Sequence, residues 1–188
     1  MKRANVVILA ACLCSAVGML AVAGEDPAGP TASPPKSEAA NQEADPVAEA
    51  RLRSRLLHEA IHGSLQIMHR DFFREGQRMP IPSDSLGDVF SELDETWHVK
   101  VRWLAVNAKP MNPKHRPDSP FDELAARAIA DGAEMYEASA GGAYQYAGAI
   151  NLGNQCLKCH VPQRTSLEDR KAAVVITMPL NLRELTEK

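Results

Sequence analysis

Apolar residues in three parts of the chain recur at spacings of three and four, which is the period of an amphipathic helix. The first segment, residues 47–73, predicts one long helix. The second runs from an N-cap at Ser83 or Ser85 to about Leu93, and the third begins with Ser119 as N-cap and Pro120 in the first turn. We expect the third helix to end at Gly141-Gly142. The expected inward faces are Leu57, Ile61, Leu65, Met68 and Phe72 in the first helix, Leu86, Val89, Phe90 and Leu93 in the second, and Phe121, Leu124, Ala128, Met135 and Tyr136 in the third.

Other segments alternate at period two, which predicts half-buried strands. In residues 97–106 the apolar set is Trp97, Val99, Val101, Trp103 and Ala105, with His98, Lys100 and Arg102 on the polar side. Residues 144–152 and 172–180 predict two further strands. Four prolines between positions 110 and 120 indicate a stiff loop. Helices mixed with hairpin-type strands predict an α+β fold with an antiparallel sheet, flanking helices and a long N-terminal helix.

The N-terminus is typical of an export signal. A positive start, an apolar run from Val6 to Ala23 and the A-x-A site at residues 21–23 predict cleavage after Ala23 and a periplasmic or otherwise exported protein. Residues 24–46 have the composition of a disordered linker, so the folded domain is expected at 47–188. An uncleaved membrane anchor, or a lipid on Cys12, is the alternative that would tie the chain to a membrane.

Cleavage would lower the net charge from −3 to −5, because Lys2 and Arg3 are removed with no acidic residue. An acidic chain gives no reason to expect a nucleic-acid partner. Cleavage would also remove Cys12 and Cys14. The two remaining cysteines would then both lie in one C-x-x-C pair, which points to chemistry rather than a structural disulfide.

Residues 156–160 read Cys-Leu-Lys-Cys-His, the attachment signature of c-type haem. Cys156 and Cys159 would bind one haem covalently, and His160 would be the proximal axial ligand of its iron. A thioredoxin-like redox pair and a zinc site are the rivals, although zinc needs more ligands at short spacing than this motif supplies. The late motif also leaves an all-α bundle of the cytochrome c′ type as an alternative fold, against which stand the predicted strands and Pro162.

The second axial position has three candidates on the first helix. His58, His62 and His69 are four and seven residues apart, which places them in one stripe beside the apolar face. His62 is central in that stripe and is the first candidate, with His69 and His58 as alternatives. The competing interpretation is that these are ordinary histidines at the boundary of the core. His115, in the proline loop, could also approach a haem.

The chain resembles a family of PAS-like single-haem c-type domains, formerly catalogued as a domain of unknown function. The resemblance rests on Arg102, Asn112-Pro113, Pro117-Asp118, the haem motif and the closing segment 174–180. The sequence departs from the family pattern at Met111, His115 and Val161. The resemblance implies a PAS-like sheet with a haem against it. Some family members use a Cys as second axial ligand; the mature chain has none to spare, so a His or Met would replace it.

These features predict a non-enzymatic haem protein that acts in electron transfer or in redox or gas sensing. Its partner would be a redox or signalling protein or a small gas molecule. A haem-dependent peroxidase or reductase is the second hypothesis, with His62 or His69 beside Arg70 and Asp71 as distal groups. A haem-free thiol oxidoreductase is the third.

Overall fold

The computed structural model describes residues 45–72, 81–161, 166 and 168–181. The expected signal peptide and almost all of the expected linker lie outside these ranges. In the described residues no helix is both long and apolar enough to cross a membrane.

The first helix, α1, spans Pro46–Ile67 and continues into the π-helical turn η2, Met68–Phe72. Asp45 caps it by accepting a hydrogen bond from the backbone N–H of Val47 at 3.0 Å. The predicted long helix is therefore confirmed, except at its end. Phe72 was expected on the inner face but is 61% exposed. A π turn takes an extra residue per turn, and this rotates Phe72 away from the apolar stripe.

The second helix, α2, spans Pro82–Trp97 and differs from the prediction at both ends. It begins after Ile81 with no side-chain cap, so neither Ser83 nor Ser85 is the N-cap. It ends at His98, whose φ of 55° is the left-handed conformation of a helix terminator. Trp97 therefore belongs to the helix rather than to a strand and is half exposed. Val89, expected on the inner face, is also half exposed, while Leu86 and Phe90 are buried.

Four antiparallel strands form one sheet in the order β1-β4-β3-β2. They are β1 Lys100–Ala105, β2 Met135–Ala140, β3 Ala143–Asn151 and β4 Lys171–Pro179. β1, β3 and β4 match the predicted strands. β2 was predicted as the end of a helix. Instead Gly141 and Gly142, with φ of 60° and 78°, form the tight turn of a β2–β3 hairpin.

The third helix, α3, spans Pro120–Ala130 and begins at Ser119, as predicted. The Ser119 hydroxyl accepts a hydrogen bond from the Asp122 N–H at 3.2 Å. The helix ends before Gly132, which has a φ of 113°. Leu124 is half exposed, and Ala125, Ala126 and Ile129 make the buried face instead.

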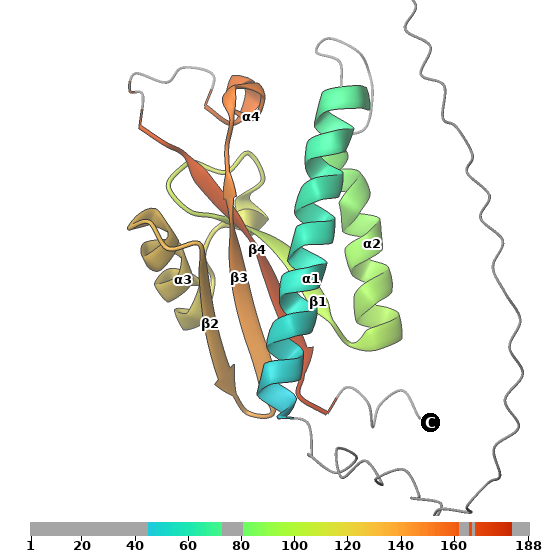
Figure 1. Ribbon diagram of the computed structural model, residues 1–188. Coiled ribbons are helices and arrows are strands. Elements are labelled where there is room, and N and C mark those ends of the chain that lie inside the picture. Colours follow the sequence, from blue (N-terminus) through green and yellow to red (C-terminus); the bar gives the residue numbers. More distant parts are fainter. Residues whose placement is uncertain (1–44, 73–80, 162–165, 167, 182–188) are drawn as a thin grey trace, which may run out of the picture. The chain divides into compact units, whose positions relative to one another are not determined.

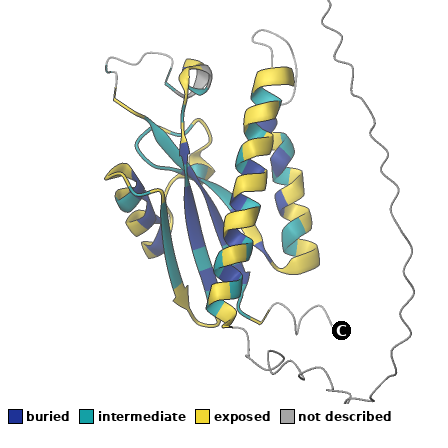
Figure 2. Ribbon diagram, viewed as in Figure 1, coloured by how far each residue is buried: buried dark blue, intermediate teal, exposed yellow. Residues whose placement is uncertain are grey.

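The helices lie on both faces of the sheet (Figure 1). α1 and α2 cover one face, and α3 covers the other. Each side has its own buried cluster, one beneath α1 and α2 that includes Phe90 and Ile176, and one beneath α3 that includes Leu104 and Ile129. The central strands β3 and β4 are buried along most of their length (Figure 2). This arrangement confirms the α+β fold and excludes the all-α bundle.

Helix α1 approaches β3 very closely at Gly148. A Cβ atom at this position would lie 2.4 Å from Cδ2 of His58, so only glycine fits against the ring. His58 is 5% exposed and its ring also contacts the Tyr146 ring edge-on, with centroids 5.8 Å apart. His58 is therefore held in the interface between α1 and the sheet.

Candidate functional site

The Cys-x-x-Cys-His motif forms a short helix between the two central strands. β3 ends at Asn151, and α4, Asn154–His160, follows Gly153. Leu157 is buried and anchors the helix, and the Leu152 N–H donates to the Arg170 carbonyl at 2.8 Å, which draws the two ends of the connection together. α4 stops two residues before Pro162, as a proline at that place requires. The side chains of Cys159 and His160 lie outside the described part of the structure.

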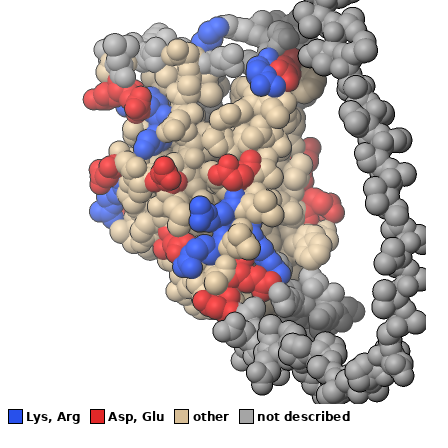
Figure 3. Space-filling view, viewed as in Figure 1, with Lys and Arg blue, Asp and Glu red and all other residues tan. Residues whose placement is uncertain are grey.

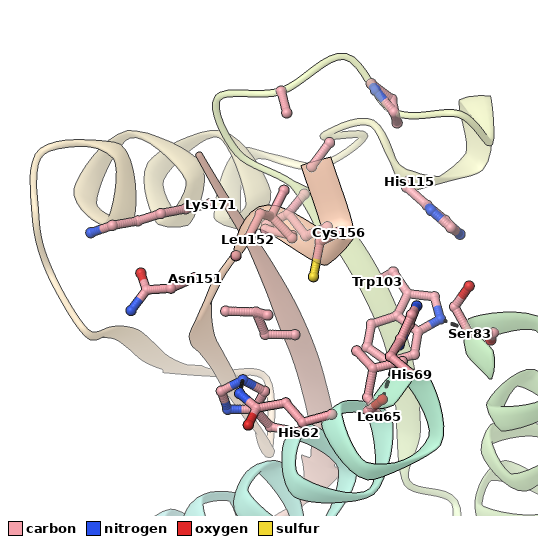
Figure 4. A pocket seen from close by; sticks show the side chains of 18 of the residues that line it. His62, Leu65, His69, Ser83, Trp103, His115, Asn151, Leu152, Cys156 and Lys171 are labelled. Carbon is pink, nitrogen blue, oxygen red and sulfur yellow. Dashed lines mark hydrogen bonds between the residues drawn. The ribbon is translucent and has the colours of Figure 1, made fainter. Parts of the chain in front are cut away.

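A pocket of about 650 Å³ lies between α4, the C-terminal part of α1, η2, and the loop after β1. Figure 4 shows the Cys156 sulfur directed into this space. The apolar part of the wall comes from Leu65, Ile67, Trp103, Leu104, Ile150 and Leu152. Trp103 is fixed there because its indole N–H donates to the Ser83 carbonyl at 3.2 Å. Pockets that bind small molecules and cofactors have volumes in this range and mostly apolar walls.

Three histidines line the same pocket. His62 and His69 come from α1 and η2, and His115 comes from the loop after β1. A ring nitrogen of His62, Nε2, is 2.8 Å from the Gln66 amide nitrogen, and Nδ1 of His69 is 2.9 Å from the Leu65 carbonyl. Burial, aided by the neighbouring His58, holds the pKa of His62 below its usual value, so this ring is neutral near pH 7.

His58 does not line the pocket. It lies one turn earlier on α1, over Gly148, with its ring 5.6 Å from that of His62. The predicted stripe of three histidines therefore divides in the folded chain. Two of its members face the pocket, and the third is part of the packing between α1 and the sheet.

A short 3-10 turn, η3, Pro113–His115, brings His115 to the pocket. Asn112 caps this turn, because its side-chain oxygen accepts a hydrogen bond from the Lys114 N–H at 3.0 Å. The Asn-Pro pair thus supplies both the cap and the first-turn proline. The sequence singled out this pair, but it did not show which side chain the turn would position.

Asn107 holds the start of the same loop against β4. Its amide donates to the Asp169 carbonyl at 3.0 Å and its oxygen accepts from the Lys171 N–H at 2.7 Å. The Asn107 carbonyl also accepts from the Arg170 side chain at 3.0 Å. No sequence pattern indicated this role. It fixes the loop that carries His115 relative to the strand that follows α4.

The far end of the loop is held by a buried carboxylate. Asp122, at 0% exposure, accepts hydrogen bonds from the Asp118 N–H and from the Arg102 guanidinium on β1. Burial alone would raise the pKa of Asp122, but the hydrogen bonds from Asp118 and Arg102 outweigh it and hold the pKa below its usual value. Two pieces of the family resemblance, Arg102 and Pro117-Asp118, are therefore parts of one structural cluster.

Two charged side chains that line the pocket, Arg70 and Lys171, are paired with protein groups. Arg70 donates to Asp71 at 2.7 Å, and Lys171 donates to the Ile129 carbonyl at the end of α3. Positive and negative side chains are interspersed over the face drawn in Figure 3. Among the described residues, no three His, Cys, Asp or Glu side chains are grouped closely enough to hold a metal ion. The three histidines therefore line the pocket as separate side chains and form no closed metal cage with the other described residues.

Comparisons with known proteins agree with this fold. The family model described as Tll0287-like matches residues 40–177. Among solved structures, the chain is similar to one titled "Crystal structure of the cyanobacterial heme-protein Tll0287", with a TM-score of 0.52 and 16% identity over 70% of this chain and 95% of that chain. No curated protein matches. The family match covers well over half of the chain, which therefore belongs to the Tll0287-like family.

Proposed function

We propose that this chain binds one haem covalently through Cys156 and Cys159, with His160 as the proximal axial ligand. The observation that carries the proposal is the Cys156 thiol directed into an apolar pocket of about 650 Å³ that histidines from separate elements also line. Membership of the Tll0287-like family supports it, since the similar solved structure is described as a haem protein. A bound haem would supply one-electron redox chemistry at its iron.

The residues present fit such a group. Leu65, Trp103 and Leu152 provide apolar contact for a flat macrocycle, and α4 holds the thiol at one side of the pocket. His62 and His69, which line the pocket from α1 and η2, could each supply an imidazole to the iron of a bound haem. A pocket with a cysteine thiol at one edge, apolar walls and few polar groups suits a fixed, buried cofactor.

The protein would act as an electron carrier or as a redox or gas sensor, without catalysing a reaction of its own. The enzymatic alternative needs polar groups that can move protons at an open iron face. Arg70 and Asp71 were its candidates, but they pair with one another and are largely exposed. We further propose that the chain is exported and that its partner is a redox or signalling protein.

The haem-free thiol oxidoreductase keeps one observation in its favour. Cys156 lies in the first turn of a helix that follows a strand, which is where such enzymes place a reactive thiol. A redox pair, however, gives no reason for a large apolar pocket lined by histidines beside it. The two functions are separated by whether the protein carries a visible chromophore.

The test is expression of the full chain with c-type maturation machinery, followed by denaturing gel electrophoresis with haem staining and by absorption spectra. We expect a haem that stays on the denatured chain, and loss of that stain in Cys156→Ala/Cys159→Ala. His98→Ala, at an exposed helix end away from the pocket, is the matched control and should retain the haem. A colourless wild type that reduces insulin would refute the proposal in favour of the thiol oxidoreductase.

A further inference from the structure

We propose that His69, rather than His62, is the second axial ligand of the haem iron; this inference rests on the proposed function. Both histidines line the pocket that Cys156 faces (Figure 4). Sequence spacing favoured His62 because it is central in the stripe. The hydrogen bonds of the two rings lead to the opposite choice.

The ring of His69 is oriented as in a metal ligand. Its Nδ1 is 2.9 Å from the Leu65 carbonyl oxygen. A carbonyl can only accept, so Nδ1 carries the proton and Nε2 carries the lone pair in the neutral ring. Histidines that bind metals commonly donate their other N–H to a backbone carbonyl, which fixes both the tautomer and the ring plane.

The backbone around His69 is also unusual. His69 lies in the π-helical turn η2, at the point where α1 stops being regular. π-helical turns are rare in proteins, and those that do occur are often found at functional sites. A π turn changes the direction of the side chains that follow it. His62 lies in the regular part of α1, where no such adjustment occurs.

One ring nitrogen of His62 has a partner on its own helix. The Nε2 atom is 2.8 Å from the Gln66 amide, four residues along the same helix. An amide N–H donates, so this contact uses the Nε2 lone pair. Coordination by His62 would require breaking that contact. His58 is excluded as a ligand by its position between α1 and Gly148, outside the pocket lining.

The assignment narrows the proposed function. With His160 and His69 both bound, the iron would have an imidazole on each face. The coordination shell then need not change on oxidation or reduction, which suits an electron carrier. Carbon monoxide and similar gases would have to displace a ligand that the Leu65 carbonyl holds in place.

The test uses the haem-loaded full chain and its ferric absorption and electron paramagnetic resonance spectra. Wild type should be low-spin, and His69→Ala should lose the low-spin signals, gain high-spin ones and bind carbon monoxide readily when reduced. Added imidazole should restore the low-spin spectrum of His69→Ala. His69→Met, which keeps a ligand atom, should give a low-spin spectrum distinct from that of wild type.

His62→Ala and His115→Ala are the comparison variants, and both should remain low-spin. A high-spin spectrum in either of them, with His69→Ala unchanged, would overturn the assignment, as would a wild type that is already high-spin. Circular dichroism of each variant excludes loss of fold as the cause. Haem staining of the denatured wild type reports attachment separately, so failure of this assignment is distinguishable from failure of the proposed function.

Discussion

The close approach of α1 to the sheet at Gly148 allows us to predict how much stability a substitution at this position would cost. Replacing Gly148 by Ala adds a Cβ atom that would lie 2.4 Å from Cδ2, 2.5 Å from Nε2 and 2.8 Å from Cγ of His58. Carbon atoms in contact prefer a separation of about 3.5–4.0 Å. The substitution therefore needs a movement of roughly 1 Å in a part of the core that is already filled.

The His58 ring has little room for that movement. It is 5% exposed and contacts the rings of Tyr146 and His62. Overpacking of this kind costs about 1–3 kcal/mol of unfolding free energy. For a protein of this size that corresponds to a fall in melting temperature of roughly 3–9 °C.

The assay is a double-mutant cycle with His58→Ala, followed by urea unfolding at constant pH and with the same cofactor loading in each variant. Removing the imidazole makes room for the new methyl group, so Gly148→Ala should cost much less in the His58→Ala background. The coupling energy should be about 1–3 kcal/mol. Gly87→Ala is the matched control, because a Cβ there meets nothing within 4 Å, and it should stabilise α2 by about 0.5–1 kcal/mol.

Two results would refute this reasoning. A Gly148→Ala variant as stable as wild type would show that α1 shifts freely over β3. If Gly148→Ala lowered the unfolding free energy equally in wild type and in His58→Ala, the destabilisation would have to arise somewhere other than the His58 contact. Either result would also remove the argument that His58 is a packing residue rather than a ligand.

Three further predictions concern the loop between β1 and α3. Asp122→Asn should destabilise the fold by about 2–4 kcal/mol, since it weakens a buried charge pair with Arg102. The pKa of Asp122 is lowered in the folded protein, so its carboxylate stabilises the fold above the unfolded pKa of about 3.9. That stabilisation is lost as the pH falls through the folded pKa. The stability of the Asn variant should therefore fall less steeply with pH below about pH 4. Asn107→Ala, which removes two side-chain hydrogen bonds, should lower stability by about 1–3 kcal/mol and speed proteolysis of the loop. Ser119→Ala removes the N-cap of α3, so it should lower the unfolding free energy measured in urea by about 1 kcal/mol. The spectrum of the bound haem should not change.

Strong local signals in the sequence were sufficient for much of the fold. The period of α1, the Ser119-Pro120 start of α3 and the alternation in β3 and β4 each satisfy a rule that needs no distant contact. β2 was missed because Met135 and Tyr136 continue the helical spacing of the residues before them. The signal that could have found it is Gly132, since glycine after a run of helical residues commonly ends the helix.

The pocket could not be predicted in the same way. Its walls come from α1, β1, β3, α4 and a loop, and the contacts that join them link residues far apart in sequence. Asn107 shows the difficulty, because its partners are 62 and 64 positions away. Cys156 was identified from its motif, but only the folded chain shows that His69 and His115 face the same space.

The three histidines of α1 show most clearly where sequence reasoning stops. A helical period gives the angle of a side chain about the axis, and by angle His58, His62 and His69 are equivalent. The period gives no information on what lies opposite at each height along the helix. At about 1.5 Å per residue, the eleven residues from His58 to His69 span roughly 16 Å, which carries the stripe from the middle of β3 past the end of the sheet. His58 therefore meets Gly148, whereas His69, farther along the same side of the helix, meets the pocket. The role of each histidine follows from what lies opposite it rather than from the sequence pattern.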